Sequence, residues 1–222
     1  MDTFFSCSAN YTLIFTSKGN IIAVGGDNMI KTTLMLYDEL RGYVNPTSKI
    51  RRMAERGELI PIIRGLYETD CDAPGYCLAG SIYGPSYLSF EFALAWHGLI
   101  PEAVYQFTCA TFHKKRKKEY ETPYGRFAYQ DVPDEAYPYG VELREENGYS
   151  FQLAAPEKAL CDQLYKLAPC GSQKEMKELL YDNLRIEPGA LRALDVEELL
   201  SLAPLYHAKN LNLLTAFARK EL

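Results

Sequence analysis

The chain has 222 residues and a formal net charge of −5, with 47% hydrophobic, 13% aromatic and 24% charged residues. This composition is ordinary for a folded globular protein and excludes a mainly disordered chain. The sequence also holds no apolar run of the roughly 18 residues that a membrane-spanning helix needs, so we expect no membrane partner.

Cysteine and histidine residues show no metal-ligand spacing. The six cysteines form no paired zinc-binding pattern, and the three histidines stand apart from one another. A chain of this length builds a core without disulfides, so we interpret the cysteines as reduced thiols. The N-terminus lacks the basic first region of a secretion signal. These features predict a cytoplasmic protein with no metal ion and no cofactor.

Residues 1–28 read as an N-terminal extension with two short strand-like runs, YTLIF and NIIAVGG, around the turn-like SKGN. A helical pattern opens at Met29. Two interpretations stay open: translation naturally starts at Met29 and the extension adds little, or it starts at Met1. The intact mass of the native protein distinguishes them.

Residues 29–70 carry the element order of a winged helix-turn-helix, a DNA-binding domain. A first helix is expected over residues 30–41, and a second, capped by Asn45, over residues 46–56. The segment ELIPIIRGLYE then reads as two short strands around the Arg64–Gly65 pair.

The second of these helices is basic. Lys49, Arg52 and Arg56 recur at spacings of three and four, so they share one face. Residues 46–67, which include Arg51, hold five basic and two acidic side chains, so their net charge is +3. Because the whole chain has a net charge of −5, the remaining residues carry −8. Such a helix can enter the major groove of DNA while the hairpin follows the phosphates. The alternative is a solvated cationic helix in an α/β domain.

A linker is expected over residues 71–85, which hold three glycines and two prolines, and a second domain over residues 86–222. Ser89 is placed to cap a helix that ends at Gly98. The strand candidates of this domain, identified by alternation, are residues 104–112, 125–132, 140–145 and 149–154.

Helices are expected in the C-terminal third of the chain. They begin at Pro156, at Ser172 with Glu175 in capping-box spacing, at Asp195, and near residue 206. The sequence thus predicts an α+β protein: an N-terminal winged helix-turn-helix, then an α/β domain with a small, mostly antiparallel sheet and C-terminal helices.

Several stretches together resemble one known family. KIRRMAERGELIPIIRGLYE resembles the basic helix and wing of the AbiEi antitoxins of type IV toxin–antitoxin systems, which act in abortive infection, a form of phage defence. YLSFEFALAWHGLIPEAV, the hairpin ending near TPYGRFAYQDVP, and AAPEKALCDQLY look like the family's second domain in the same order. The resemblance runs from about Met29 to Leu167, with a looser fit beyond.

The resemblance implies both partners and residues. In that family the winged domain binds the promoter of its own operon, and the second domain opposes a nucleotidyltransferase-like toxin without needing a stable complex. By this match, the DNA contacts are Lys49, Arg51, Arg52 and Arg56 of the basic helix, with Arg64 and Gly65 at the wing tip. The family's PEKAL signature and its following aspartate are matched by Glu157, Lys158 and Asp162. One departure is that two helices precede the wing here, where this DNA-binding fold usually has three.

The sequence offers little for catalysis. Glu157 and Asp162 lie five positions apart, about 140° around a helix, so they do not form a paired acid–base site. The sequence contains no phosphate-binding P-loop and no G-x-S-x-G elbow. Two interpretations of the PEKAL signature stay open: it caps a helix and locks it to the sheet, or it forms a surface that contacts toxin or RNA.

Five adjacent cations lie between two of the expected strands, in a long connection at a hairpin tip: Lys114, Lys115, Arg116, Lys117 and Lys118. Five like charges cannot pack together, so the run projects into water or meets anions. Acidic side chains in residues 131–147 can screen it on the surface. The alternatives are an auxiliary contact to DNA phosphates and a contact to RNA or toxin.

The leading interpretation is a DNA-binding antitoxin that is not an enzyme, with its own promoter and a toxin as partners. The first rival is a transcriptional regulator whose second domain senses a small molecule, and growth rescue on co-expression with the toxin separates the two. The second rival is an RNA- or nucleotide-processing enzyme. Metal-dependent turnover that is lost on changing Glu157 or Asp162 would favour it.

Overall fold

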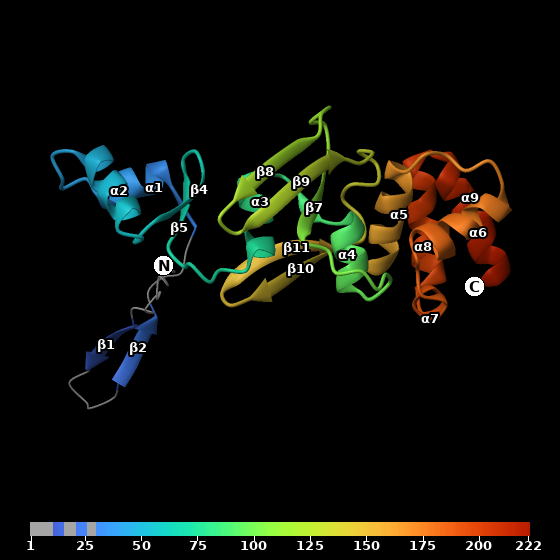
Figure 1. The fold of residues 1–222 in the computed structure, drawn as a ribbon, viewed down its shortest axis with the longest axis horizontal. Helices are drawn as coiled ribbons and strands as arrows, with labels where there is room; N and C mark the ends of the chain where they lie inside the picture. The colour runs from blue at the N-terminus through green and yellow to red at the C-terminus, as the bar shows by residue number, and fades with distance from the viewer. Residues whose placement is uncertain (1–10, 16–20, 26–29) are drawn as a thin grey trace, which may run out of the picture. The chain divides into compact units, whose positions relative to one another are not determined.

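The structure, a computed structural model, describes residues 11–15, 21–25 and 30–222 (Figure 1). The first two segments are the strands β1 (Tyr11–Phe15) and β2 (Ile21–Gly25), which pair antiparallel. The two strand-like runs predicted for the N-terminal extension are thus confirmed. The predicted SKGN turn and the start proposed at Met29 lie outside the described residues.

The chain forms two compact units, Met1–Pro74 and Gly75–Leu222. The boundary falls inside the linker expected over residues 71–85, and most of that stretch is grouped with the second unit. Two of its three glycines, Gly75 and Gly84, pack closely against other parts of the chain. A Cβ on Gly75 would lie 2.3 Å from the backbone oxygen of Tyr124, so glycine permits close approach rather than flexibility.

Besides the β1–β2 pair, the described part of the first unit contains two helices and a three-stranded antiparallel sheet in the order β3-β5-β4. These helices and strands are β3 (Lys31–Thr32), α1 (Thr33–Glu39), α2 (Pro46–Glu55), β4 (Ile60–Ile63) and β5 (Leu66–Glu68). Helix α1 begins later than expected because β3 pairs with β5 and the Thr32 side chain caps the helix. Leu36, Leu40, Ile50 and Leu59 form a buried apolar cluster in this unit, and Ile62 and Leu66 of the hairpin are buried as well.

The second unit contains a six-stranded sheet in the order β10-β11-β6-β7-β9-β8. The strands are β6 (Tyr87–Leu88), β7 (Gln106–Thr111), β8 (Lys118–Thr122), β9 (Gly125–Asp131), β10 (Val141–Glu146) and β11 (Tyr149–Ala154). The pairs β11–β6 and β7–β9 are parallel and the other three are antiparallel. The sheet is therefore larger and more mixed than the small, mostly antiparallel sheet predicted.

The connection from β7 to β9 differs from the expected hairpin. Strand β8 lies between them in the sequence and forms an antiparallel hairpin with β9. In the sheet, β8 pairs with the edge of β9 that faces away from β7, and β9 runs parallel to β7. The predicted loop at residues 113–124 is thus partly a strand. Its sequence, KEYET, carries three charges and no clear apolar alternation, which is typical of an exposed edge.

Helices flank the sheet, and α5 occupies the centre of the helical part. The helices are η1 (Gly75–Leu78), α3 (Ala79–Ile82), α4 (Phe90–Trp96), α5 (Pro156–Lys166), α6 (Gln173–Glu178), η2 (Leu179–Asn183), α7 (Pro188–Arg192), α8 (Val196–Leu202), η3 (Ala203–Tyr206) and α9 (Lys209–Glu221). Figure 1 shows α5 between α4 on one side and α8 and α9 on the other, and it contacts all three. Within the part of the chain that the structure describes, every helix is too short or too polar to cross a lipid bilayer.

Candidate functional site

Helix α2 presents the predicted DNA-binding residues to solvent. The side chain of Asn45 accepts a hydrogen bond from the backbone N–H of Ser48 at 3.0 Å, so the helix begins where its cap predicts. Ile50 is buried in the core of the first unit, whereas Arg52 and Arg56 are exposed. The helix thus separates an apolar face from a cationic one.

The cations of α2 are held by weak surface contacts. Arg51 Nε lies 3.6 Å from Glu55 Oε1, and Arg56 Nη1 lies 3.6 Å from Glu58 Oε1. Lys49 is half-buried, with its ammonium 5.6 Å from the centre of a tyrosine ring. Exposed ion pairs contribute only ~0–1 kcal/mol each, so an anionic partner can replace these contacts.

The β4–β5 hairpin has Arg64 and Gly65 at its tip, as predicted. Arg64 is exposed. Gly65 has φ of +86°, a conformation that favours glycine, and its backbone oxygen accepts a hydrogen bond from the N–H of Thr33 at 3.0 Å. The tip is therefore anchored to the start of α1, and Arg64 projects from a fixed turn.

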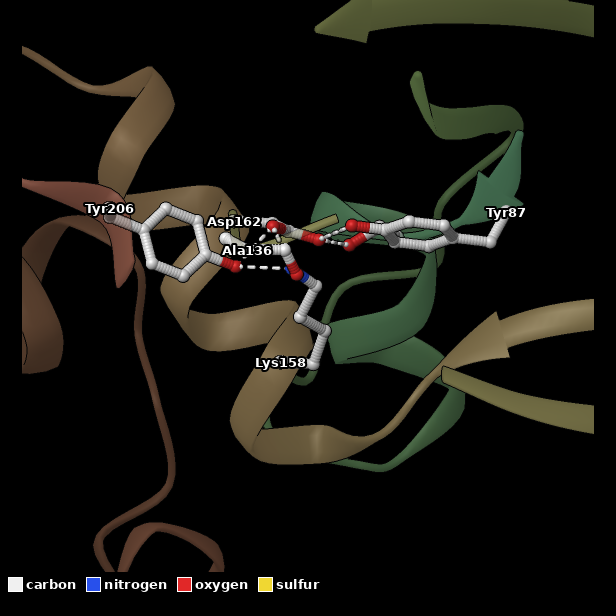
Figure 2. A network of polar contacts seen from close by, with 6 residues as sticks. Tyr87, Ala136, Lys158, Asp162 and Tyr206 are labelled. Atoms are coloured by element: carbon white, nitrogen blue, oxygen red, sulfur yellow. Dashed lines mark hydrogen bonds and ion pairs between the residues drawn. The ribbon is translucent and has the colours of Figure 1, made fainter. Parts of the chain in front are cut away.

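Figure 2 shows Lys158 and Asp162 of the PEKAL signature at the centre of a buried polar network. Neither side chain has exposed surface, and Lys158 Nζ lies 3.3 Å from Asp162 Oδ1. The ammonium also donates to the backbone oxygen of Ala136 at 2.6 Å and to the hydroxyl of Tyr206 at 2.7 Å. Burial lowers the pKa of Lys158, and the charge of Asp162 opposes that shift. The ammonium therefore has two hydrogen-bond acceptors and one ion-pair partner.

The carboxylate of Asp162 is equally well satisfied. Its Oδ1 accepts the hydroxyl of Tyr206 at 2.5 Å besides the ammonium, and its Oδ2 accepts the hydroxyls of Tyr87 at 3.0 Å and Ser89 at 2.6 Å. Four contacts match the four lone-pair sites of a carboxylate. Burial, and then the charge of Asp162, raise the pKa of Tyr87 and of Tyr206 well above the usual value, so both hydroxyls keep the proton that they donate.

Glu157, the third signature residue, faces a different partner. Its buried carboxylate accepts a hydrogen bond from the backbone N–H of Asp195 at 2.8 Å, next to the start of α8. Lys158 and Asp162 have no surface with which to touch a toxin or an RNA. The geometry agrees with the interpretation that the signature locks α5 to the sheet and to the C-terminal helices.

Sequence reasoning missed the partners of this ion pair. Tyr87, Ser89 and Tyr206 lie 75, 73 and 44 positions from Asp162. Ser89 was expected to cap α4, but its side chain makes no cap hydrogen bond there and donates to Asp162 instead. The spacing of four between Lys158 and Asp162 was a signal for the ion pair itself, but no local signal pointed to its partners.

The cationic run 114–118 leads from β7 into the edge strand β8. The ammonium of Lys114 donates to the backbone oxygen of Gly84 at 3.0 Å, and the backbone N–H of Lys115 donates to Asp131 Oδ2 at 2.6 Å. Among the residues that the structure describes, none of the five side chains forms an ion pair. The acidic stretch 131–147 thus contacts the run through its backbone, at Lys115, and surface screening of the five charges stays an open interpretation.

One group of three potential metal ligands occurs among the described residues: Asp70, Cys71 and Asp72. Cys71 is disulfide-bonded, so it supplies no thiolate and is not the reduced thiol that the sequence predicts. The cysteines that are free and buried are Cys77, Cys109, Cys161 and Cys170.

No protein-family model and no curated protein matches the chain.

Proposed function

We propose that the protein binds duplex DNA at the promoter of its own operon through α2 and the β4–β5 hairpin. One observation carries the proposal: α2 buries Ile50 and presents Arg52 and Arg56 to solvent, in a unit whose hairpin fixes an exposed Arg64 at its tip. Arginine suits both phosphate contacts and bidentate contacts to guanine in the major groove.

The architecture of the first unit supports this use. A short helix braces the basic helix through the core, and the three-stranded sheet holds the hairpin beside them in one unit. Phosphate contacts would position the module, and groove contacts from α2 would supply sequence preference. Two helices precede the hairpin in the described part of the unit, so α2 takes the place of the groove-reading helix.

We further propose that the second unit acts as an antitoxin against a nucleotidyltransferase-like toxin. This part of the proposal rests on the resemblance of the chain to the AbiEi family. The completely satisfied Lys158–Asp162 pair supports a rigid structural role for the PEKAL signature, which is consistent with antagonism that needs no catalysis. Growth rescue by the full chain on co-expression with the toxin tests it, and absence of rescue by a folded, expressed chain contradicts it.

DNA binding is tested with the double variant Arg52→Ala/Arg56→Ala and a labelled duplex of the upstream region. If about five cations engage phosphates, the wild-type log–log salt slope is roughly −4.5, and the variant's slope is shallower by about 1.8. We expect the affinity at fixed salt to fall at least roughly tenfold. Fluorescence anisotropy at several salt concentrations measures both quantities.

The matched control is Arg192→Ala/Arg219→Ala, which removes two exposed arginines from the second unit. It should leave the affinity and the slope close to wild type. Equal affinities for the two double variants would contradict the proposed role of α2.

A further inference from the structure

The cationic run 114–118 begins with a turn that other parts of the second unit hold in place. His113 and Lys115 have φ of +57° and +58°, a conformation that residues other than glycine rarely adopt. Asp131 fixes this turn, because its carboxylate accepts a hydrogen bond from the hydroxyl of Thr111 and another from the backbone N–H of Lys115, both at 2.6 Å. Backbone strain that the surrounding structure enforces is frequent at ligand sites, which makes the run a candidate contact surface.

The cations of the run differ in what they contact. Lys114 is half-buried, and its ammonium donates to a backbone oxygen of the α3–β6 loop at 3.0 Å and lies 5.0 Å from the centre of the Tyr83 ring. The side chains of residues 115–117 are exposed, and within the described part of the chain they form neither an ion pair nor a hydrogen bond. Their three charges are therefore available to an anionic partner.

Two tyrosines lie beside the run on one face of the sheet. In the antiparallel pairing of β8 with β9, Lys118 is opposite Tyr129, and the side chain of Tyr120, two positions further on, points to the same face. The Tyr83 ring packs on this face, 6.0 Å from the Tyr120 ring and 5.3 Å from the Tyr129 ring. Tyr83 and Tyr120 are both half-buried at the edge strand, so part of each ring reaches solvent.

The acidic side chains of β8 point to the opposite face of the sheet. Glu119 and Glu121 alternate with Tyr120 along the strand, so they lie on the other side of it. Glu121 is also paired with Arg126 of β9 at 3.1 Å. The face of β8 that carries Tyr120 therefore presents a lysine and a tyrosine but no carboxylate.

Cations next to partly exposed aromatic rings suit a single strand of nucleic acid. The phosphates of such a strand can follow the cations while its unpaired bases stack on the rings. A duplex keeps its bases stacked inside, so it would use the cations but leave the tyrosines without a partner. An acidic protein surface would leave them without a partner for the same reason.

We propose that the run 114–118, together with Tyr83 and Tyr120, binds single-stranded RNA. Its phosphates lie at residues 115–117 and its bases stack against the two rings. Unpaired bases that can be splayed onto aromatic side chains are the part of RNA that proteins usually recognise. The proposal concerns the second unit alone, and it holds or fails independently of DNA binding by the first unit.

The test uses the full chain with Arg52→Ala/Arg56→Ala in every sample, so that the first unit contributes little to nucleic-acid binding. The probe is a labelled oligouridylate of about 12 nucleotides, within the span of about 4–16 nucleotides that single-strand sites occupy. Fluorescence anisotropy measures its affinity at several salt concentrations. We expect it to bind more tightly than a DNA duplex of the same length, although the duplex has the denser charge.

Two variants separate the phosphate contacts from the stacking contacts. Lys115→Gln/Arg116→Gln/Lys117→Gln should lower the affinity for oligouridylate by roughly tenfold or more and make the log–log salt slope shallower by about 2, since three phosphate contacts are lost. Tyr83→Leu/Tyr120→Leu keeps apolar side chains but removes both rings. It should lower the affinity by roughly fivefold or more and leave the salt slope unchanged, because stacking neutralises no phosphate.

The matched controls remove the same kinds of group elsewhere in the second unit. Lys174→Gln/Lys177→Gln/Arg219→Gln removes three exposed cations, and Tyr139→Leu/Tyr165→Leu removes two exposed tyrosines. Each control should retain the affinity to within about threefold, the effect of a general change in potential.

Losses as large in the controls as in the matching variants overturn the proposal, as does a lack of oligouridylate binding by folded protein at about 100 μM. A duplex that binds as tightly as oligouridylate, with no effect of Tyr83→Leu/Tyr120→Leu, overturns the single-strand part. Oligothymidylate that binds roughly tenfold more tightly than oligouridylate assigns the surface to single-stranded DNA and overturns the RNA part.

Discussion

Lys158 and Asp162 illustrate how a charged pair survives in a protein interior. Removing both charges from water costs several kcal/mol for each ion, and their mutual attraction offsets that cost only when the remaining hydrogen-bonding sites are also filled. Here they are filled, by Ala136, Tyr206, Tyr87 and the Ser89 hydroxyl. The pair is therefore more sensitive to loss of one partner than to replacement of both.

Asp162→Asn should lower the free energy of unfolding by about 3–5 kcal/mol, because it leaves the Lys158 ammonium buried without a counter-charge. The double variant Lys158→Met/Asp162→Leu should recover only part of that loss, because it removes both charges but leaves the buried hydroxyls of Tyr87, Ser89 and Tyr206 without their acceptor. Urea denaturation measures both effects. The midpoint urea concentration should shift, while the dependence of the unfolding free energy on urea concentration (the m-value) should stay the same.

The control for the single variant is Asp182→Asn, which changes an exposed aspartate in the same unit and should alter stability by no more than about 0.5 kcal/mol. If Asp162→Asn is as mild as this control, Lys158 does not depend on the charge of Asp162.

At the scale of single elements, helix α4 begins in an unusual way. Its N-terminal N–H groups receive no cap from Ser89, the residue in the cap position. Thr108 on the neighbouring strand β7 accepts from Phe92 N instead and also binds the Ser89 carbonyl. The first turn of α4 is thus capped by a side chain from the sheet rather than by its own N-cap residue.

Thr108→Val keeps the shape of the side chain but removes both hydrogen bonds at the start of α4. The buried N–H and carbonyl groups lose their partner, so we expect a loss of about 2–4 kcal/mol in unfolding free energy. Thr215→Val is the matched control, because Thr215 bonds the carbonyl of Leu211 within its own helix α9 and should cost less than about 1 kcal/mol. Equal midpoints for the two variants in urea would show that Thr108 does not hold α4.

Elements whose signals are local could be predicted from the sequence. Asn45, Ser172 and Asp195 each cap the helix that the sequence assigns to them, at 3.0, 3.2 and 2.9 Å. The strand β8 could not be predicted, because a short, charged edge strand lacks apolar alternation, and the parallel pairing of β7 with β9 depends on it. The exposed cationic face of α2 could be predicted from helical periodicity. The partners of Asp162 could not, because they lie in distant segments of the chain and no local sequence pattern indicates that these segments meet.

At the scale of the whole molecule, the two units have very different cores. The described part of the first unit has a cluster of four buried residues, to which Leu36 contributes a side chain with no exposed surface, and few further buried apolar side chains, such as Ile62 and Leu66. The second unit buries many more side chains, among them Leu94, Leu153 and Leu211. Since stability grows with buried apolar area, the first unit is the more easily unfolded of the two.

Leu36→Ala should destabilise the first unit by about 2–5 kcal/mol, most of what so small a core provides. We expect amide protons of residues 30–68 to lose protection in hydrogen-exchange mass spectrometry, while residues 75–222 keep theirs. DNA binding should be lost with that protection.

Leu211→Ala makes the same substitution in the second unit and should produce the opposite pattern, with exchange accelerated in residues 75–222. Loss of protection spread evenly over both units in either variant would show that the chain unfolds as one body.

The strand order of the six-stranded sheet also bears on self-association. Its two outermost strands are β8, with the sequence KEYET, and β10, with the sequence VELREE. A second molecule that extended the sheet would have to place a strand against one of these charged borders, where like charges would face each other in a symmetric antiparallel pairing. The charges on both edge strands therefore oppose edge-to-edge association of sheets. We expect them to limit aggregation of the concentrated protein even where no helix or loop covers these edges.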